Sequence, residues 1–190
     1  MLCERNLSAG AMSDGQVVLG IDPGSRKTGY GLVRMQGSEV SYVASGCIKL
    51  GESELYKRLQ TIFSAVSTII GQYSPDVMAI EETFLSKNVQ STVKLSEARA
   101  AAMVAGTNAG LEIFEYAPRK IKQAVVGYGA AQKEQVQFMV KNILRLSGAI
   151  QADSADALAC AICHAYTAKM AGAVRGVELS SSVRGRYRTR

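Results

Sequence analysis

The chain has 190 residues, of which 47% are hydrophobic and 20% are charged, an ordinary balance for one globular domain. No run approaches the roughly 18 apolar residues of a membrane-spanning helix, and the first fifteen residues lack the apolar core of a secretory signal. We therefore expect a cytoplasmic protein with free cysteines. The net charge of +6 favours an anionic partner.

The positive charge is concentrated near the C-terminus. Residues 171–190 contain five arginines and a single acid, Glu178, and they lack apolar periodicity, so we expect a basic disordered tail. We also expect residues 1–15 to be a disordered N-terminal extension. Residues 16–170 then form the folded domain.

The first half of the folded part predicts strands around one helix. Residues 17–22, VVLGID, form an apolar run typical of a strand buried on both faces. Two further strands follow the turn PGSRKTG, with Gly37 between them favouring a hairpin. Residues 55–70 have apolar residues at helical spacing, and residues 76–82, DVMAIEE, form a second apolar run. A strand, a helix and a strand in this order predict that the two apolar runs pair in parallel.

The second half predicts mostly helices. Residues 89–106 read as a helix rich in alanine, whose small side chains permit close approach in the core or at a dimer contact. A strand is expected at 111–117, a short helix near 118–126, and a longer helix at 132–146. Residues 151–169 form the final helix. The alternation of strands and helices indicates an α/β fold.

The final helix contains two patterns with chemical potential. Cys160, Cys163 and His164 spell C-x-x-C-H, as in haem or metal sites. A tetrahedral zinc site needs more ligands, and His164 is the only histidine of the chain. Cysteine is also a common small buried residue in a helix. We therefore interpret these three residues as core packing.

The other pattern is a set of four acids. Asp22 and Glu81 end the two apolar runs, and Asp153 and Asp156 lie one helical turn apart. The helix acids alone would suit a helix cap, and Asp22 would suit a turn before proline. Parallel neighbouring strands, however, would bring Asp22 and Glu81 to one sheet edge. Converging carboxylates raise each other's pKa, which divalent cations relieve. The acids therefore favour metal-assisted hydrolysis of a phosphodiester.

Basic and aromatic residues lie between these acids along the chain. Each basic residue could be an ordinary solvated side chain, but together they are candidate phosphate ligands. Phe84 is either a core anchor or a platform for an unpaired base. The DNA-binding candidates are Phe84, Lys87, Arg119, Lys120, Lys122 and Lys133.

Four stretches in register resemble the RuvC family of Holliday junction resolvases. They are GIDPGSRKTGYG, AIEETFLSKN, FEYAPRKIKQAVVGYG and QADSADALACAI, and the likeness runs from about residue 17 to 168. The resemblance implies a ribonuclease H-like fold with a mixed five-stranded sheet flanked by helices. It also implies a homodimer that nicks two opposed strands of a four-way DNA junction in recombination and repair.

The resemblance assigns roles to individual residues. Asp22, Glu81, Asp153 and Asp156 match the family's four catalytic, metal-binding acids, which implies Mg²⁺, two ions per site, with Mn²⁺ as a substitute. Phe84 matches an aromatic that helps to open bases. Lys122 and Lys133 match basic positions near the scissile phosphate. The helix at 89–106 falls where the family dimerises, and junction-recognition and branch-migration proteins are the implied partners.

Two alternatives belong to other functional classes. A ribonuclease H-like RNA-processing nuclease of the YqgF type would share the fold and would cut structured RNA. A non-catalytic junction-binding scaffold would be expected to lack one of the four acids, all of which are present here. The full run of stretches favours the DNA resolvase.

Overall fold

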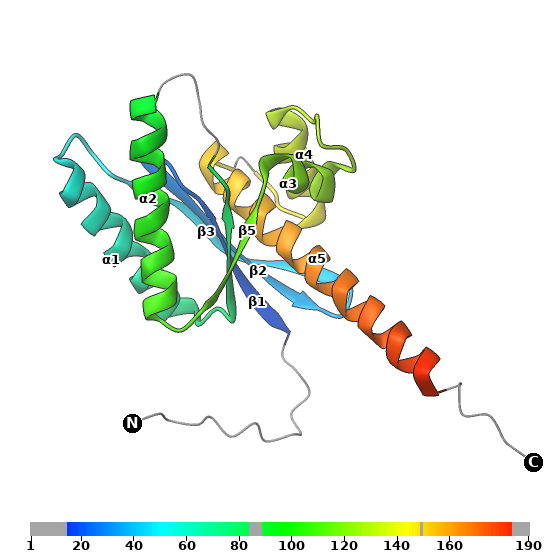
Figure 1. Cartoon of the computed structure of the whole chain (residues 1–190). Coiled ribbons are helices and arrows are strands. Elements are labelled where there is room, and N and C mark those ends of the chain that lie inside the picture. The colour runs from blue at the N-terminus through cyan, green and yellow to red at the C-terminus, as the bar shows by residue number, and fades with distance from the viewer. Residues whose placement is uncertain (1–14, 84–88, 149, 184–190) are drawn as a thin grey trace, which may run out of the picture.

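The computed structural model describes residues 15–83, 89–148 and 150–183. A five-stranded sheet, in the order β3-β2-β1-β4-β5, lies between two layers of helices (Figure 1). The strands are β1 (Gln16–Asp22), β2 (Lys27–Gln36), β3 (Glu39–Lys49), β4 (Val77–Glu81) and β5 (Glu112–Tyr116). The first three pair antiparallel, while β4 pairs in parallel with both β1 and β5. The predicted mixed five-stranded sheet is confirmed.

Five helices cover the sheet. Two of them, α1 (Leu55–Tyr73) and α2 (Val89–Asn108), share one hydrophobic cluster with the sheet. The other face is covered by α3 (Pro118–Val126), α4 (Lys133–Ile143) and α5 (Ala152–Val183). None of the described helices has both the length and the apolar character that crossing a bilayer needs.

Strand β1 lies in the middle of the sheet, which explains its uninterrupted apolar sequence. Leu19 and Ile21 pack into the cluster formed with α1 and α2, whereas Val18 packs into the cluster formed with α3, α4 and α5. All three side chains are fully buried. A strand covered on both faces has no solvent side on which polar residues would alternate.

Helix α5 lies very close to β1 and β2 because glycines face it. A Cβ atom on Gly20 would stand 2.1 Å from the Ala157 carbonyl oxygen, and one on Gly29 would stand 2.0 Å from the Asp153 carbonyl oxygen. No real Cβ tolerates such distances, so any other residue would push the helix away from the sheet. The glycines therefore set the height of the first turn of α5 above the sheet.

The structure differs from the sequence-based expectations at two helix ends. The expected disordered tail from residue 171 is helical as far as Val183, where α5 extends beyond the sheet (Figure 1). The hydrogen bonds of a helix need no apolar face, and no proline interrupts this segment. The helix expected at 132–146 ends at Ile143, since Arg145 has a positive φ of 52°. Residues 1–14 and 184–190 lie outside the described residues.

Candidate active site

The ends of two parallel strands bring two acids together. Ile21 of β1 pairs with Ile80 of β4, so Asp22 and Glu81 follow at the same level of the sheet. Helix α5 begins over this edge and contributes Asp156. The three acids line a pocket of about 300 Å³ together with two lysines. Its lining is Asp22, Glu81, Pro118, Ile121, Lys122, Lys133, Val136, Asp156 and Ala159.

The pocket strongly disfavours negative charge on its two strand acids. Burial, followed by repulsion from Glu81 and Asp156, raises the pKa of Asp22 to about 8. Burial and the Asp156 charge raise the pKa of Glu81 to about 7, against the opposing charges of Lys122 and Lys133. Near neutral pH, Asp22 is therefore mostly protonated and Glu81 partly so, and a bound cation would favour their ionised forms.

Lys133 supplies part of the missing positive charge. Its ammonium nitrogen lies 2.5 Å from the Asp156 Oδ2 atom. The hydrogen bond to Asp156 raises the pKa of Lys133, although partial burial opposes this. Because 52% of the Lys133 side chain is exposed, the ammonium group can leave Asp156 for another anion without unpacking the core.

The fourth predicted acid does not line the pocket. Asp153 lies in the first turn of α5, above Gly29, and its Oδ2 atom is 3.8 Å from the Cys47 sulfur, which donates to it. Its charge still contributes to the raised pKa of Asp22. The structure therefore brings three of the four acids together and turns the fourth toward β3. Nothing in the local sequence around Cys47 indicated this contact.

Arg99 of α2 is a second residue that the sequence did not reveal. Its Nε atom donates to the Glu81 carbonyl oxygen at 3.1 Å, and its guanidinium also forms an ion pair with Glu115 of β5. These contacts join the ends of β4 and β5 beside the pocket. Arg99 thus holds the backbone of Glu81, a role that depends on contacts across the fold.

The predicted basic and aromatic residues have different positions. Lys122 and Lys133 line the acid pocket, and their predicted place near the scissile phosphate stays a prediction. Arg119 is exposed and lies over Gly129, where a Cβ atom would approach its Cγ atom to 2.4 Å. Phe84 and Lys87 lie outside the described residues, and their roles stay predictions.

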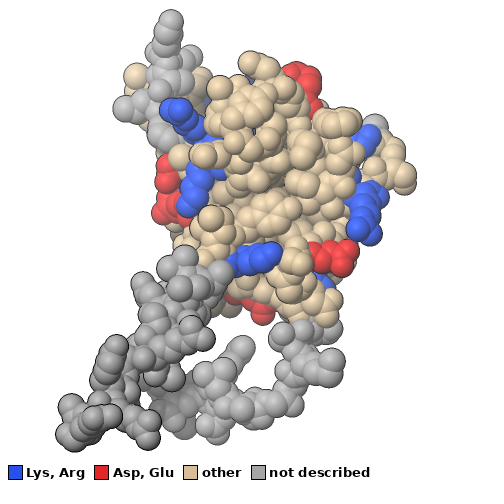
Figure 2. Space-filling view, turned by 90° about the vertical axis from the view of Figure 1, so that its right-hand side faces the viewer, with Lys and Arg blue, Asp and Glu red and all other residues tan. Residues whose placement is uncertain are grey.

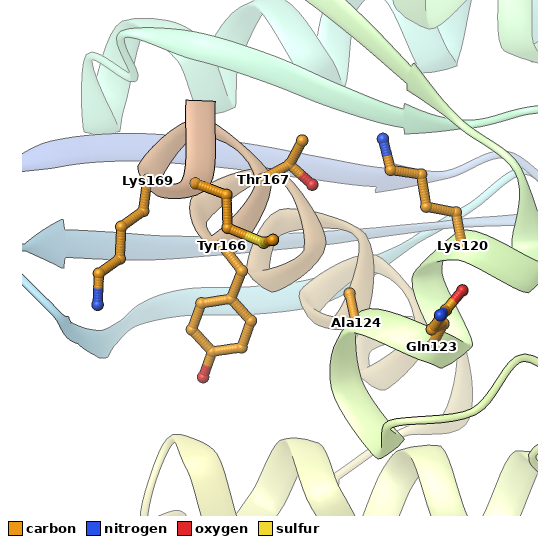
Figure 3. A pocket seen from close by; sticks show the side chains of 7 residues that line it. Lys120, Gln123, Ala124, Tyr166, Thr167 and Lys169 are labelled. Atoms are coloured by element: carbon orange, nitrogen blue, oxygen red, sulfur yellow. The ribbon is translucent and has the colours of Figure 1, made fainter. Parts of the chain in front are cut away.

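A larger cavity lies elsewhere. It has a volume of about 580 Å³ and separates α3 from the outer part of α5 (Figure 3). Lys120, which lies 4.8 Å from the centre of the Tyr116 ring, borders it together with Tyr166 and Thr167. No carboxylate lines this cavity, so the hydrolytic chemistry belongs to the acid pocket.

The C-x-x-C-H residues pack in the core, as predicted. Cys160 and Cys163 are fully buried, and His164 is 2% exposed. The Nδ1 atom of His164 shares a 2.9 Å hydrogen bond with the Tyr116 hydroxyl, and its ring stacks at a tilt on Phe114. Burial lowers the pKa of His164, which suits a neutral ring in the core.

The acid pocket has the donor chemistry of a site for hard cations. Carboxylate oxygens are the ligands that Mg²⁺ prefers, and burial, followed by the charges of neighbouring carboxylates, raises the pKa values of Asp22 and Glu81. Among the described residues, no three His, Cys, Asp or Glu side chains stand close enough to hold an ion as they lie. Lys133 is bound to Asp156 and Asp153 faces Cys47, so side-chain rotations must accompany metal binding.

Comparison with known proteins gives the family. Residues 18–164 match the family model described as crossover junction endodeoxyribonuclease RuvC. The chain belongs to the RuvC family. A crossover junction endodeoxyribonuclease RuvC of Vibrio cholerae is 55% identical over 172 residues, covering 90% of this chain and 99% of that protein. One from Aliivibrio fischeri is 54% identical with the same coverage. The sequence-based prediction of a RuvC endonuclease is confirmed.

Solved structures agree with this assignment. The T. thermophilus RuvC in complex with Holliday junction substrate is 34% identical, with a TM-score of 0.78, covering 82% of this chain and 96% of that one. The yeast mitochondrial Holliday junction resolvase Ydc2 is 13% identical, with a TM-score of 0.59 and coverage of 82% of both chains, a likeness of fold alone. The predicted ribonuclease H-like fold of the RuvC family is confirmed.

Proposed function

We propose that this protein nicks two opposed strands of a four-way DNA junction by divalent-metal-dependent hydrolysis. The observation that carries the proposal is the pocket where Asp22, Glu81 and Asp156 meet Lys122 and Lys133. The RuvC relative from T. thermophilus, whose structure contains a Holliday junction substrate, supports the choice of DNA. The paired cuts would serve recombination and repair, in the cytoplasm where that DNA lies.

The acids would hold the metal. Asp22, Glu81 and Asp156 offer oxygen ligands in the pocket, and Asp153 lies one turn of α5 from Asp156. We propose Mg²⁺, two ions per site, with Mn²⁺ as a substitute. When bound, such ions activate a water molecule and stabilise the leaving oxygen. The raised pKa values of Asp22 and Glu81 favour this, because a cation is what allows both acids to ionise.

The lysines would hold the scissile phosphate. Lys133 is placed by Asp156, and Lys122 projects from α3 into the same pocket. Both ammonium groups would neutralise the negative charge that grows on the phosphate oxygens during attack. Arg119, exposed at the start of α3, would contact neighbouring phosphates. Phe84 and Lys87 remain candidates for contacts with unpaired bases and backbone.

The exposed face of α2 supports a homodimer. The small residues Ala98, Ala102 and Ala105 pack inward beside α1, so they do not form the dimer contact. Val93 and Val104, by contrast, are 49% and 55% exposed and lie on the outer side of the helix. A two-fold dimer through this face would supply two active sites for paired cuts. We also propose action with junction-recognition and branch-migration proteins.

The dimer proposal predicts the effect of charge on this face. Val93→Glu should shift the protein toward monomer, because an unpaired carboxylate would be buried in the contact. Sedimentation velocity measures the change in mass. Lys94→Glu, on the same helix, is the control for adding a carboxylate. An unchanged mass for Val93→Glu and for Val104→Glu would place any dimer contact elsewhere.

Cleavage of an end-labelled synthetic four-way junction tests the proposed function. With Mg²⁺, the wild-type protein should make paired symmetric nicks, whereas Asp22→Asn should lose at least about a thousandfold in rate, because a neutral amide holds the cation poorly. A structured RNA of similar size is the matched substrate for the alternative RNA-processing function. Tight junction binding without nicks, across several junction sequences and metals, would instead support a scaffold.

A further inference from the structure

A second pocket adjoins the turn that follows Asp22, and it is strongly basic. It has a volume of about 690 Å³ and draws its residues from the β1–β2 turn, the end of β3, the start of α1 and the start of α2. Five cations line it against one acid, Glu52. The cations are Arg26, Lys27, Lys49, Arg58 and Lys94.

The cations of this pocket have no acidic partner within ion-pair distance among the described residues. The ion pairs among the described residues join Arg99 to Glu115, Lys133 to Asp156 and Arg145 to Glu39, and none involves the five cations. Lys27 and Lys49 also pair directly across β2 and β3, where like charges destabilise a sheet. An uncompensated pair of this kind gains stability only when an anion binds between or beside the two ammonium groups.

Arg58, which also lines the basic pocket, has a buried hydrogen-bond donor. Its Nη1 atom donates to the Ser25 carbonyl oxygen at 2.9 Å, which fixes the guanidinium against the β1–β2 turn. Its Nε atom is buried and finds no acceptor among the described residues. A buried N–H without an acceptor is costly, and an oxyanion in the pocket is the kind of ligand that could satisfy it.

The basic pocket lies close enough to the acids for one DNA arm to contact both. Asp22 pairs with Gly29, which pairs with Cys47 on the next strand, and Lys27 and Lys49 lie two residues farther along those strands. Strand spacing and rise place their Cα atoms about 8 and 12 Å from that of Asp22. These distances are short enough for one DNA arm to contact both the acids and the two lysines.

The lining favours a phosphate backbone as the ligand. Among the described residues, no aromatic side chain lines the pocket, so they offer bases no stacking platform. The side of the molecule in Figure 2 is uncharged over most of its middle and has Lys and Arg side chains only toward its margins. The five cations of the basic pocket are therefore not matched by a similar concentration in the middle of this face.

We propose that this basic pocket binds backbone phosphates of a junction arm, close to the phosphodiester held by Asp22, Glu81 and Asp156. This proposal rests on the proposed function, because the basic pocket would bind the same DNA. It would fix the direction in which the arm leaves the acid pocket. Arg58 and Lys27 would contact the backbone from the turn side, and Lys94 from α2.

The test compares two variants that lose the same charge. Lys27→Gln/Lys49→Gln removes the cross-strand pair, and Lys141→Gln/Lys169→Gln removes two cations outside the pocket. Junction affinity is measured against salt concentration in EDTA. The pocket variant should bind at least about tenfold more weakly near 0.1 M salt, and its log–log salt slope should be shallower by about 1.8, since each phosphate contact contributes about 0.9. The control should differ less than about threefold.

A modified substrate locates the contact. Neutral methylphosphonates are placed one at a time at the phosphates next to the cut, and at one of these positions the change should weaken binding of the wild type but not further weaken the pocket variant. Lys94→Gln, on an exposed helix position, provides a second variant if the double substitution fails to fold. Salt slopes equal to the control for both variants would overturn the pocket, while normal wild-type nicking of the same junction in a parallel assay with Mg²⁺ would leave the proposed function intact. Absence of wild-type nicking would overturn the proposed function itself.

Discussion

The aspartates beside the two ends of the central strand β1 have opposite effects on the stability of the fold. At its start, the exposed Asp76 accepts a 2.7 Å hydrogen bond from the Val17 N–H through its Oδ2 atom and ties the entry of β4 to β1. At its end, Asp22 is largely enclosed beside Glu81 and Asp156, and its pKa is raised to about 8. The first carboxylate stabilises the fold. The second opposes the folded state, which is typical of a group retained for its chemistry.

The largest expected effect is on the pH dependence of stability. Because the folded-state pKa of Asp22, about 8, lies above its ordinary 3.8, the folded protein keeps a proton that the unfolded chain releases. Stability is therefore greatest below about pH 4 for this group and falls as the pH rises toward 8, by on the order of 3–5 kcal/mol. Asp22→Asn should remove most of this loss.

Urea unfolding in EDTA, from pH 5 to 9, measures this effect. The difference in unfolding free energy between Asp22→Asn and the wild type should grow with pH. Adding Mg²⁺ at pH 8 should stabilise the wild type more than the variant, since a ligand that binds only the folded state adds stability. Parallel pH profiles for the two proteins would contradict the assigned burial of Asp22.

A smaller effect is expected where α5 meets the sheet at the catalytic end. Gly29→Ala should destabilise the protein by about 2–3 kcal/mol, because the new Cβ atom would stand 2.0 Å from the Asp153 carbonyl oxygen. Gly71→Ala is the matched control: nothing lies within 4 Å of its Cβ position in α1, and alanine favours helix by about 0.5–1 kcal/mol. Thermal unfolding should therefore move in opposite directions for the two changes.

The smallest effect concerns the other end of β1. Asp76→Ala should destabilise the protein by about 1–2 kcal/mol, because the Val17 N–H loses its acceptor. Its effect on junction cleavage under conditions where the protein stays folded should be less than about twofold. A loss of cleavage as large as that of Asp22→Asn would show that the two ends are not separate in function.

The strand acids could be predicted because their signal is local. The apolar run 17–22 ends in Asp22, the run in β4 ends in Glu81, and parallel pairing of neighbours brings both to one edge. The positions of Asp153 and Asp156 relative to each other follow from one helical turn. Their different surroundings do not, because one faces Cys47 and the other Lys133, residues that lie far away or in another element.

Helix α5 continues to Val183, past the end near residue 170 that the sequence predicts, for a related reason. Loss of apolar periodicity after residue 171 predicts that the helix ends there. Helix continuation depends on backbone hydrogen bonds propagated from a stable, well-packed turn. That packed part of α5, from Ala155 to Ala165, supplies the nucleus that an isolated segment would lack.

The family, the alternation of strands and helices, and the acids that end the two central strands can all be inferred from the amino-acid order, because they follow from local pattern. The ion pair between Lys133 and Asp156, the contact of Arg99 with the Glu81 backbone and the basic pocket beside Asp22 arise from folding alone. That pocket gathers residues from 25–27, 49–58 and 91–94. These segments lie far apart in the sequence and meet because two helices pack on one edge of the sheet. Local periodicity in the sequence therefore does not predict their contacts.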